Sequence, residues 1–444
     1  MRFIRFLINF IRRFLFLAVN EFIYGKLSSK REFIKLSKLI NYAWNNIPFY
    51  RRYWMDNGFN PSLFKSLDDF NRIPLIDKDI IRKYRDCILP EKVNKKHLQL
   101  ITTGGTTGMP MSFYCDKVLA KSKELAYIFI YNYKMFGIKR VWDRSIVIRG
   151  YKINENLINE KIYWRYSKKR NALIMSSFHI NSESVYGYIE AINKFNPKHI
   201  FAYPSSLVSL CSTMKKNGLK LKVKIDRIVT SSENIYDWQR DLVREVLDAE
   251  IYSFYGHGEK CVIAYQSMRC SNMHFNPFYG YTEFLNENGN HCSYRGERGE
   301  IVVTSFDNTY YPFIRYKTND IIEYDGSVCS CCGMPVLSAK KLVGRISDVV
   351  FNADNSVSVF TFSDVVFNDL KKITAYQYQQ DEPGKMILRY ESENELLNSE
   401  LIHLYSELDK YFPNIEFSLE HVLHISRTGS GKFRYLIQNI KNKY

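Results

Sequence analysis

Several features that would assign this chain of 444 residues to a secreted or nucleic-acid-binding class are missing from it. Its nine cysteines do not form a disulfide framework at this length, which indicates a reducing compartment, the cytoplasm. There is no internal repeat and no low-complexity linker. No lysine- and arginine-rich block is interleaved with aromatic residues, so nucleic acid is not an expected partner. The formal net charge of +17 therefore points to smaller anionic partners such as nucleotides, coenzyme A or acidic lipid, unless it reflects compositional bias alone.

The composition that is present predicts a globular protein of two or three domains. Hydrophobic residues make up 45% of the chain and charged residues 25%, which is ordinary for such proteins. Strand-like runs alternate with helical segments through the middle of the chain, a pattern typical of parallel α/β layers. These runs are 145–148, 199–202, 227–230 and 251–254.

The flanking segments have other periodicities. Residues 31–95 are expected to be helical with proline breaks, 98–101 form a short strand, and 117–137 a further helix. Turn residues separate short β runs over 276–325, which predicts a small β-rich subdomain. A separate domain of β then α character follows from about residue 345.

Residues 1–25 predict a basic amphipathic helix. Arg2, Arg5, Arg12 and Arg13 gather on one side of a helical wheel, and the other side is almost entirely apolar. The arginines keep every apolar run too short to span a membrane, and no signal-peptide cleavage site follows. The helix either lies on an anionic membrane surface, at the inner face of the membrane, or packs on the body of the protein.

A glycine- and threonine-rich loop follows the short strand at 98–101. Small side chains leave backbone N–H groups and hydroxyls exposed, which suits the loop to hold a polyphosphate. It is not a Walker A loop, because Met109 stands where that motif has lysine. The expected phosphate-binding residues are Thr103, Gly104, Gly105, Thr106, Thr107 and Gly108.

Four further motifs follow the loop in the chain. They are Tyr-Gly-His-Gly-Glu at 255–259, Arg-Tyr-Lys-Thr-Asn-Asp at 315–320, Gly-Arg-Ile-Ser-Asp at 344–348 and Ser-Gly-Lys-Phe-Arg at 430–434. With the loop, they resemble in type and order the motifs of the adenylate-forming (acyl-CoA synthetase, AMP-binding) superfamily. The branch of phenylacetate–coenzyme A ligases and related capsular-polysaccharide proteins is the most similar, as the stretches at 48–51, 203–207 and 231–233 indicate.

This resemblance implies a multi-domain α/β fold. After the helix at 1–25, a large α/β adenylation domain would span 26–343, with its β-rich subdomain at 276–343. A small α+β lid domain would span 344–444. Asp348 would be the hinge between the two.

The resemblance also implies residue roles. Glu259 would bind the Mg²⁺ that bridges the phosphates of ATP, since hard cations prefer carboxylate oxygen. Asp320 would bind the ribose hydroxyls, and Arg345 the ribose or phosphates. Lys432 would reach the α-phosphate from the mobile lid. The adenine would lie against Ser232, Glu233, Tyr255 and Gly256.

A second cluster has metal-ligand spacing. Cys329 and Cys332 are separated by two residues, as in a zinc knuckle, and Cys270 and His274 supply a second pair. These four would hold a structural Zn²⁺, with Cys331 as a competing ligand. The alternative is a set of buried thiols.

The expected function is ATP-dependent activation of a small carboxylic acid to an acyl adenylate, with pyrophosphate released. Transfer to coenzyme A or another thiol or amine would follow, in cell-surface polysaccharide biosynthesis. The alternative is a decayed adenylation fold that serves as a membrane-associated scaffold. The chain has Gly104 where serine is common and Met109 where many members have lysine, which favours that alternative slightly. The four retained positions Glu259, Asp320, Arg345 and Lys432 argue against it.

Overall fold

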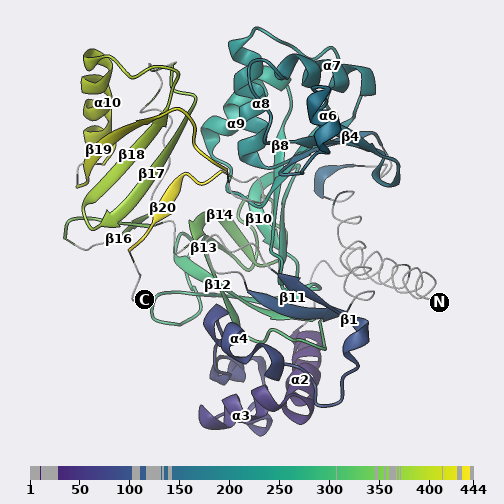
Figure 1. Cartoon of the computed structure of the whole chain (residues 1–444). Helices are drawn as coiled ribbons and strands as arrows, with labels where there is room; N and C mark the ends of the chain where they lie inside the picture. Colours follow the sequence, from purple (N-terminus) through teal and green to yellow (C-terminus); the bar gives the residue numbers. More distant parts are fainter. Residues whose placement is uncertain are drawn as a thin grey trace. The chain divides into compact units, whose positions relative to one another are not determined.

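The structure is a computed structural model of the whole chain (Figure 1). It describes residues 11, 29–102, 111–116, 132, 135–138, 143–306, 308–345, 349–354, 357–359, 367, 370, 372–412, 414–427 and 433–440. For residues 345, 349, 357–359 and 411 it describes the backbone alone. The phosphate-loop residues, most of the predicted helices at 1–25 and 117–137, Asp348 and Lys432 lie outside the described residues.

The chain forms two compact units, each built from two separate stretches. The first unit comprises Met1–Val141 and Tyr252–Leu342, and the second comprises Trp142–Ile251 and Val343–Tyr444. Among the helices that are described, none has both the length and the apolar character needed to cross a membrane.

The first unit begins with the predicted helical segment. Helix α2 buries Leu36, Leu39, Ile40 and Ala43, which recur at the spacing of one helical face. Pro48 occupies the first turn of α3, where its missing N–H leaves no hydrogen bond unmade. The helices are α2 (Ser29–Asn46), α3 (Pro48–Asp56) and α4 (Lys78–Tyr84), with 3₁₀ turns η1 (Pro61–Leu63), η2 (Leu67–Arg72), η3 (Arg85–Cys87) and η4 (Lys95–His97).

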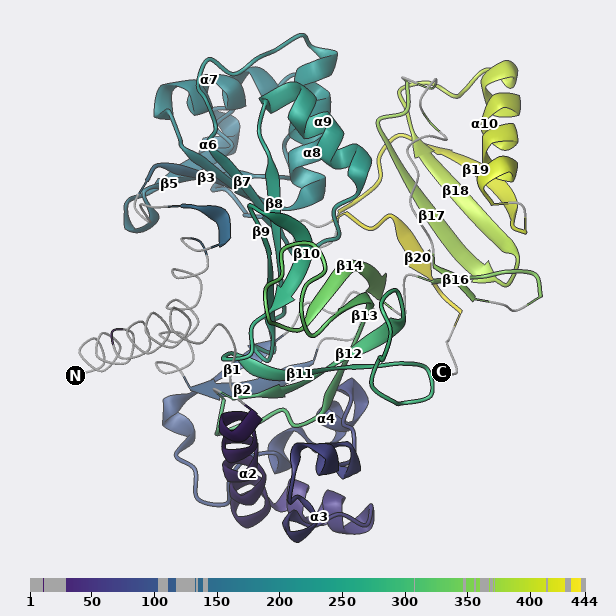
Figure 2. The same ribbon diagram turned by 180° about the vertical axis from the view of Figure 1, so that it is seen from behind.

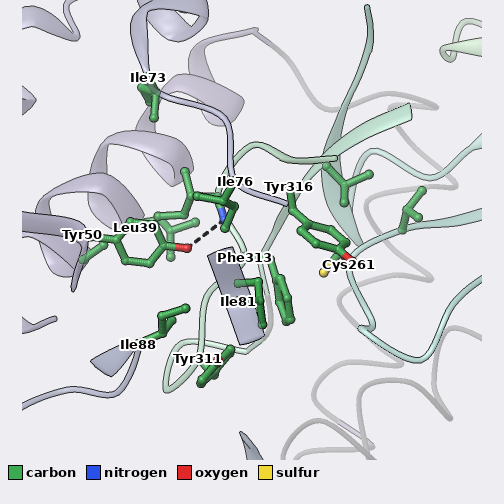
Figure 3. Packing of buried hydrophobic residues seen from close by; sticks show 14 of the residues in the cluster. Leu39, Tyr50, Ile73, Ile76, Ile81, Ile88, Cys261, Tyr311, Phe313 and Tyr316 are labelled. Carbon is green, nitrogen blue, oxygen red and sulfur yellow. Dashed lines mark hydrogen bonds between the residues drawn. The ribbon is translucent and has the colours of Figure 1, made fainter. Parts of the chain in front are cut away.

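These helices pack on the β-rich part of the unit through an aromatic core (Figure 3). The hydroxyl of Tyr50 on α3 donates to the carbonyl of Pro312 at 2.6 Å and accepts from the N–H of Ile314 at 3.2 Å. Tyr311, Phe313 and Tyr316 are completely buried beside it. The fully buried ring therefore keeps its polar atom satisfied while it joins α3 to a segment some 260 residues later.

The strands of the first unit are largely antiparallel. A separate hairpin pairs β1 (Leu98–Thr102) with β2 (Ser112–Asp116), across the undescribed loop. The larger array has the order β11-β12-β13-β14-β10-β9-β8. Its strands are β8 (Ile251–Gly256), β9 (Ile263–Ser267), β10 (Cys270–Phe275), β11 (Gly280–Leu285), β12 (Arg298–Ser305), β13 (Tyr316–Gly326) and β14 (Ser338–Arg345).

The second unit contains the parallel α/β layers. Strands β3, β5, β6 and β7 run parallel in the order β7-β6-β3-β5, and β4 pairs antiparallel at the edge. Helices α7, α8 and α9 pack on one face of this sheet (Figure 2). The elements are β3 (Ser145–Arg149), α6 (Glu155–Asn159), β4 (Trp164–Ser167), η5 (Lys168–Arg170), β5 (Ala172–Ser176), α7 (Val185–Phe195), β6 (His199–Ala202), α8 (Pro204–Lys216), β7 (Arg227–Ser231) and α9 (Asp237–Leu247).

A second sheet lies in the C-terminal stretch of this unit and has its own core. It has the order β19-β18-β17-β20, and Leu404 and Leu408 of α10 are buried against it. The mixed α/β fold predicted from the sequence is therefore confirmed. The elements are β15 (Val349–Phe351), β16 (Val357–Val359), β17 (Ala375–Glu382), β18 (Lys385–Glu391), α10 (Asn398–Tyr411), β19 (Glu416–Val422) and β20 (Leu436–Gln438).

Candidate functional site

A buried carboxylate follows strand β8 in the first unit. Glu259 is 6% exposed, and its Oε2 lies 3.0 Å from Nδ1 of His257. The hydroxyl of Tyr316 donates to Oε1 at 3.2 Å. Burial by itself would raise the pKa of Glu259, but His257 and, more weakly, Lys78 hold it at about 2. The side chain is therefore an ionised carboxylate in a buried setting, which suits it to bind a cation.

Two of the predicted nucleotide residues meet in the same unit. The hydroxyl of Tyr255 on β8 donates to Oδ2 of Asp320 on β13 at 2.6 Å. The preceding Asn319 has a φ of 63°, in the left-handed region that asparagine tolerates better than most residues. This turn within the strand orients Asp320, whose own N–H donates to Thr318 Oγ1 at 3.1 Å.

Gly256 ends strand β8 beside this pair. A Cβ added there would approach no described atom closer than 3.4 Å, the carbonyl oxygen of Val262. Since that is an ordinary contact, packing within the protein does not demand glycine at this position. A need for glycine here would come from a bound molecule.

The four predicted soft ligands converge in the first unit. Their ligand atoms lie within 4.8 Å of one another, with Cys270 Sγ 3.6 Å from Cys329 Sγ and Cys332 Sγ 3.2 Å from His274 Nε2. Zinc–sulfur bonds of about 2.3 Å in a tetrahedron place two sulfurs about 3.8 Å apart. Cys331 is exposed and does not join the group.

The surroundings orient these ligands. Nδ1 of His274 lies 3.0 Å from the carbonyl oxygen of Tyr265, so a proton there leaves Nε2 free for a metal. Burial lowers the pKa of His274, because desolvation disfavours the charged form of the ring. Asn272 donates through its backbone N–H to Cys270 Sγ at 3.3 Å and through its amide to Asp325 at 3.0 Å. The cluster thus has a fixed second layer of hydrogen bonds.

The second unit contains the other predicted adenine residues, Ser232 and Glu233. Ser232 has a φ of 73°, an unusual conformation for serine that turns the chain sharply after β7. The carboxylate of Glu233 accepts from the N–H of Ser205 at 2.9 Å and from its hydroxyl at 3.0 Å. Because Ser205 lies in the first turn of α8, Glu233 places a negative charge at the positive end of that helix.

Arg427 joins this group and was not expected from the sequence. Its guanidinium donates to Ser205 Oγ at 3.2 Å and to Ser209 Oγ at 2.7 Å. Burial lowers the pKa of Arg427, and Glu233 counteracts that effect. No local motif could have identified it, because one arginine among 63 basic residues carries no distinguishing spacing.

Arg315, the first residue of the motif at 315–320, makes structural contacts to buried groups of the protein. It forms two hydrogen bonds to the buried carboxylate of Glu283, at 3.1 and 3.0 Å. Its remaining nitrogen donates to the carbonyls of Asn71 and Ile73. Arg345 ends strand β14, and only its backbone is described.

The fold of the chain is similar to that of solved acyl-CoA ligases. A solved 2-hydroxyisobutyryl-CoA ligase in complex with an acyl-AMP matches 93% of this chain and 89% of its own, with a TM-score of 0.69 at 18% identity. The same enzyme with 2-HIB-AMP and CoA matches with a TM-score of 0.58. No protein-family model matches the chain.

Two relatives are more similar to the chain in sequence than these solved structures are. Protein CapK of Staphylococcus aureus is 27% identical over 413 residues, covering 92% of this chain and 88% of that protein. Phenylacetate-coenzyme A ligase of Thermus thermophilus is 24% identical over 331 residues, covering 71% and 70%. The chain is a homologue of CapK and of the phenylacetate–coenzyme A ligases, and its structural neighbours are acyl-CoA ligases, so the predicted relationship to ligases is confirmed.

Proposed function

We propose that the protein activates a small carboxylic acid with ATP and transfers the acyl group to coenzyme A or another thiol or amine. In the first step a carboxylate oxygen attacks the α-phosphorus of ATP, the bond to the bridging oxygen breaks, and pyrophosphate leaves. In the second step the acceptor attacks the acyl carbon, and AMP leaves with the electron pair of the acyl–oxygen bond. Homology to ligases and the fold shared with acyl-CoA ligases support the reaction class.

The observation that carries the proposal is the ionised, buried Glu259 in the same unit as the Tyr255–Asp320 pair. Tyr316 donates its hydroxyl to Glu259 and lies on the same strand, β13, as Asp320. A protein interior retains an ionised carboxylate when a cation or hydrogen bonds compensate its desolvation. A metal–phosphate group at Glu259 and a ribose at Asp320 are consistent with this spacing along β8 and β13.

A bound Mg²⁺ would neutralise phosphate charge as pyrophosphate departs. Glu259 fits such an ion because it offers hard, ionised oxygen and has a very low pKa. His257 and Tyr316 orient the carboxylate, so that little rearrangement is needed when the ion arrives. The proposed phosphate loop at 103–108 and Lys432 would add N–H groups and an ammonium, since this reaction depends on positioning and charge. Ser232, Gly256 and Arg345 would complete the nucleotide contacts, and Asp348 the hinge.

Pyrophosphate exchange tests this proposal. Labelled pyrophosphate should enter ATP in the presence of Mg²⁺ and the correct member of a panel of acids. Glu259→Gln keeps the side-chain shape and removes the charge, so the exchange rate should fall by about 100-fold or more. Lys432→Ala should lower it similarly.

The matched controls are Glu287→Gln and Lys410→Ala, two exposed side chains far from the motifs. Both should retain wild-type exchange. An unchanged rate in Glu259→Gln would contradict the assigned metal ligand. ATP binding without exchange for any acid, including those in a cell extract, would favour the scaffold alternative.

A structural zinc site at Cys270, His274, Cys329 and Cys332 forms part of the proposal. The Sγ and Nε2 distances fit a tetrahedral site closed at four ligands, which leaves no coordination position for substrate. Elemental analysis should give about one zinc per chain. Cys332→Ser should lose it, whereas the exposed neighbour Cys331→Ser should keep it. Equal zinc contents in the two variants would contradict the ligand set.

The setting in cell-surface polysaccharide biosynthesis is supported only by the homology to CapK. A basic N-terminal helix would bring the enzyme to the inner face of the membrane. Deleting residues 1–19 should move the protein from the membrane fraction to the soluble fraction and leave ATP binding intact. Unchanged sedimentation would mean that the helix packs on the protein.

A further inference from the structure

A row of polar side chains crosses the parallel sheet of the second unit at the carboxyl ends of its strands. In the sheet register Arg149 on β3 pairs with Ser176 on β5. The pair Ile148 and Ala202 places Tyr203 beside Arg149, and the pairing of β6 with β7 places Ser231 next along the row. In open α/β sheets this edge is where ligands bind.

This row lies on the sheet face opposite helices α7, α8 and α9. Side chains alternate between faces, and Ile146 and Ile148 belong to the core that those helices cover. Val147 belongs to a separate cluster with Ala172 and Ile174, which Phe201 and Tyr151 complete. Arg149 therefore projects from the second face, next to this cluster, in which only Tyr151 and Phe201 are partly exposed.

Two neighbours hold the guanidinium of Arg149 at the sheet edge. Its Nη2 donates to Ser231 Oγ at 3.0 Å, and its Cζ lies 5.2 Å from the ring centre of Tyr203. The backbone supports this arrangement, because the N–H of Tyr203 donates to the carbonyl of Ile148 at 3.3 Å. A guanidinium fixed by a hydroxyl and an aromatic face is preorganised for a planar anion.

The contacts of Arg149 leave part of its guanidinium without a partner. Among the described residues no carboxylate forms an ion pair with Arg149, and its buried Nε has no hydrogen-bond partner. A guanidinium carries five N–H donors, and a buried unsatisfied donor is costly, so an acceptor from outside the described chain fits here.

We infer that Arg149, with Ser231 and Tyr203, forms a subsite for a second oxyanionic group on the carboxylic acid substrate. The inference rests on the proposed function, because it identifies the acid as one that carries a further carboxylate or phosphate. Ser231 directly precedes the Ser232–Glu233 stretch, which is proposed to lie against the adenine. The partly buried side chains of Tyr151 and Phe201 favour the body of an acid over a nucleotide phosphate, which is the other source of an oxyanion.

Succinate and butyrate test for recognition of the second oxyanionic group, since both have four carbons and only succinate has a second carboxylate. Pyrophosphate exchange by the full-length protein should favour succinate over butyrate. Arg149→Met should lower kcat/KM for succinate about 100-fold and change that for butyrate less than about 3-fold. Arg149→Lys, which keeps the charge and loses the fork geometry, should lose about 10-fold. Arg144→Met, an exposed arginine just before the same strand, is the matched control and should change neither acid.

Calorimetric binding separates failure of the subsite from failure of the proposed reaction. If no acid supports exchange, succinate binding by the wild type that is lost in Arg149→Met still supports the subsite. Equal succinate binding in the two proteins, or none in either, overturns it. Preference of the wild type for butyrate overturns it while the adenylation proposal stands. A tenfold loss of ATP affinity in Arg149→Met, with the acid preference unchanged, would assign the guanidinium to the nucleotide instead.

Discussion

Replacing Arg315 by methionine should destabilise the first unit by an amount that depends on pH. The guanidinium donates to the buried carboxylate of Glu283 and, at 2.7 Å each, to the carbonyls of Asn71 and Ile73. Both charged side chains are less than 5% exposed. Methionine leaves the buried carbonyl of Ile73 and the part-buried carbonyl of Asn71 without this donor, at about 1–2 kcal/mol each, so the loss at pH 7 should be about 3 kcal/mol.

The pH dependence follows from Glu283. Burial raises its pKa to about 7, and Arg315 works against this increase. A carboxyl group whose folded pKa is raised loses stability as pH rises from the unfolded pKa to the folded one. For the wild type this loss ends near pH 7. Without Arg315 the folded pKa rises further, so the variant should keep losing up to about 1.4 kcal/mol for each pH unit above 7.

Urea unfolding followed by tryptophan fluorescence measures this effect. Trp44 on α2 and Trp54 on α3 stack with their ring centres 6.4 Å apart, so their emission reports unfolding of the N-terminal helical segment. Arg315 is hydrogen-bonded to the end of that segment through Asn71 and Ile73. The double variant Arg315→Met, Glu283→Gln is the control, and its deficit should be constant between pH 7 and 9. A deficit below about 1 kcal/mol, or one independent of pH in the single variant, would refute the reasoning.

Three further predictions follow from other buried contacts. Hydrogen bonds outweigh the burial of Asp325 and hold its pKa at about 2, so the ionised carboxylate adds roughly 2 kcal/mol to the free energy of unfolding above pH 4 and loses this as pH falls towards 2. In metal-free protein, Asp325→Asn should therefore show a flatter dependence of stability on acid pH. A dependence identical to that of the wild type would contradict this. Arg427→Ala should leave the carboxylate of Glu233 without its buried cationic neighbour and weaken hydrogen-exchange protection of residues 414–427 about tenfold; unchanged protection would disprove the contact. Gly280→Ala would place a Cβ 2.1 Å from the carbonyl oxygen of Cys261, so little folded protein should be recovered; a variant with wild-type melting temperature would show that the strands can separate.

Local patterns predicted much of the fold. The runs at 145–148, 199–202 and 227–230 are strands β3, β6 and β7, and the run at 251–254 begins β8. A short apolar run between turn signals needs no knowledge of distant partners to be recognised as a strand. The spacing of Cys329 and Cys332 likewise predicted that these two side chains lie together, and the structure places them in one cluster with Cys270 and His274.

Other features depended on contacts between distant parts of the chain. Arg315 has the appearance of a motif residue in the sequence, yet in the structure it clamps Glu283 and a helical segment about 240 residues earlier. Nothing in the sequence marks Arg427, but in the structure its guanidinium donates to Ser205 and Ser209 of α8. Neither role could be predicted from spacing, because each requires partners that only folding brings near.

The amino-acid sequence by itself determined the alternation of strands and helices, the order of the motifs and the pairing of cysteines at knuckle spacing. Those properties arise from side-chain periodicity and from neighbours a few residues apart. The tertiary structure alone decided that Arg149, Ser176, Tyr203 and Ser231 form one row. Four strands must pair in one register before these residues can meet, and register is set by the packing of the whole sheet.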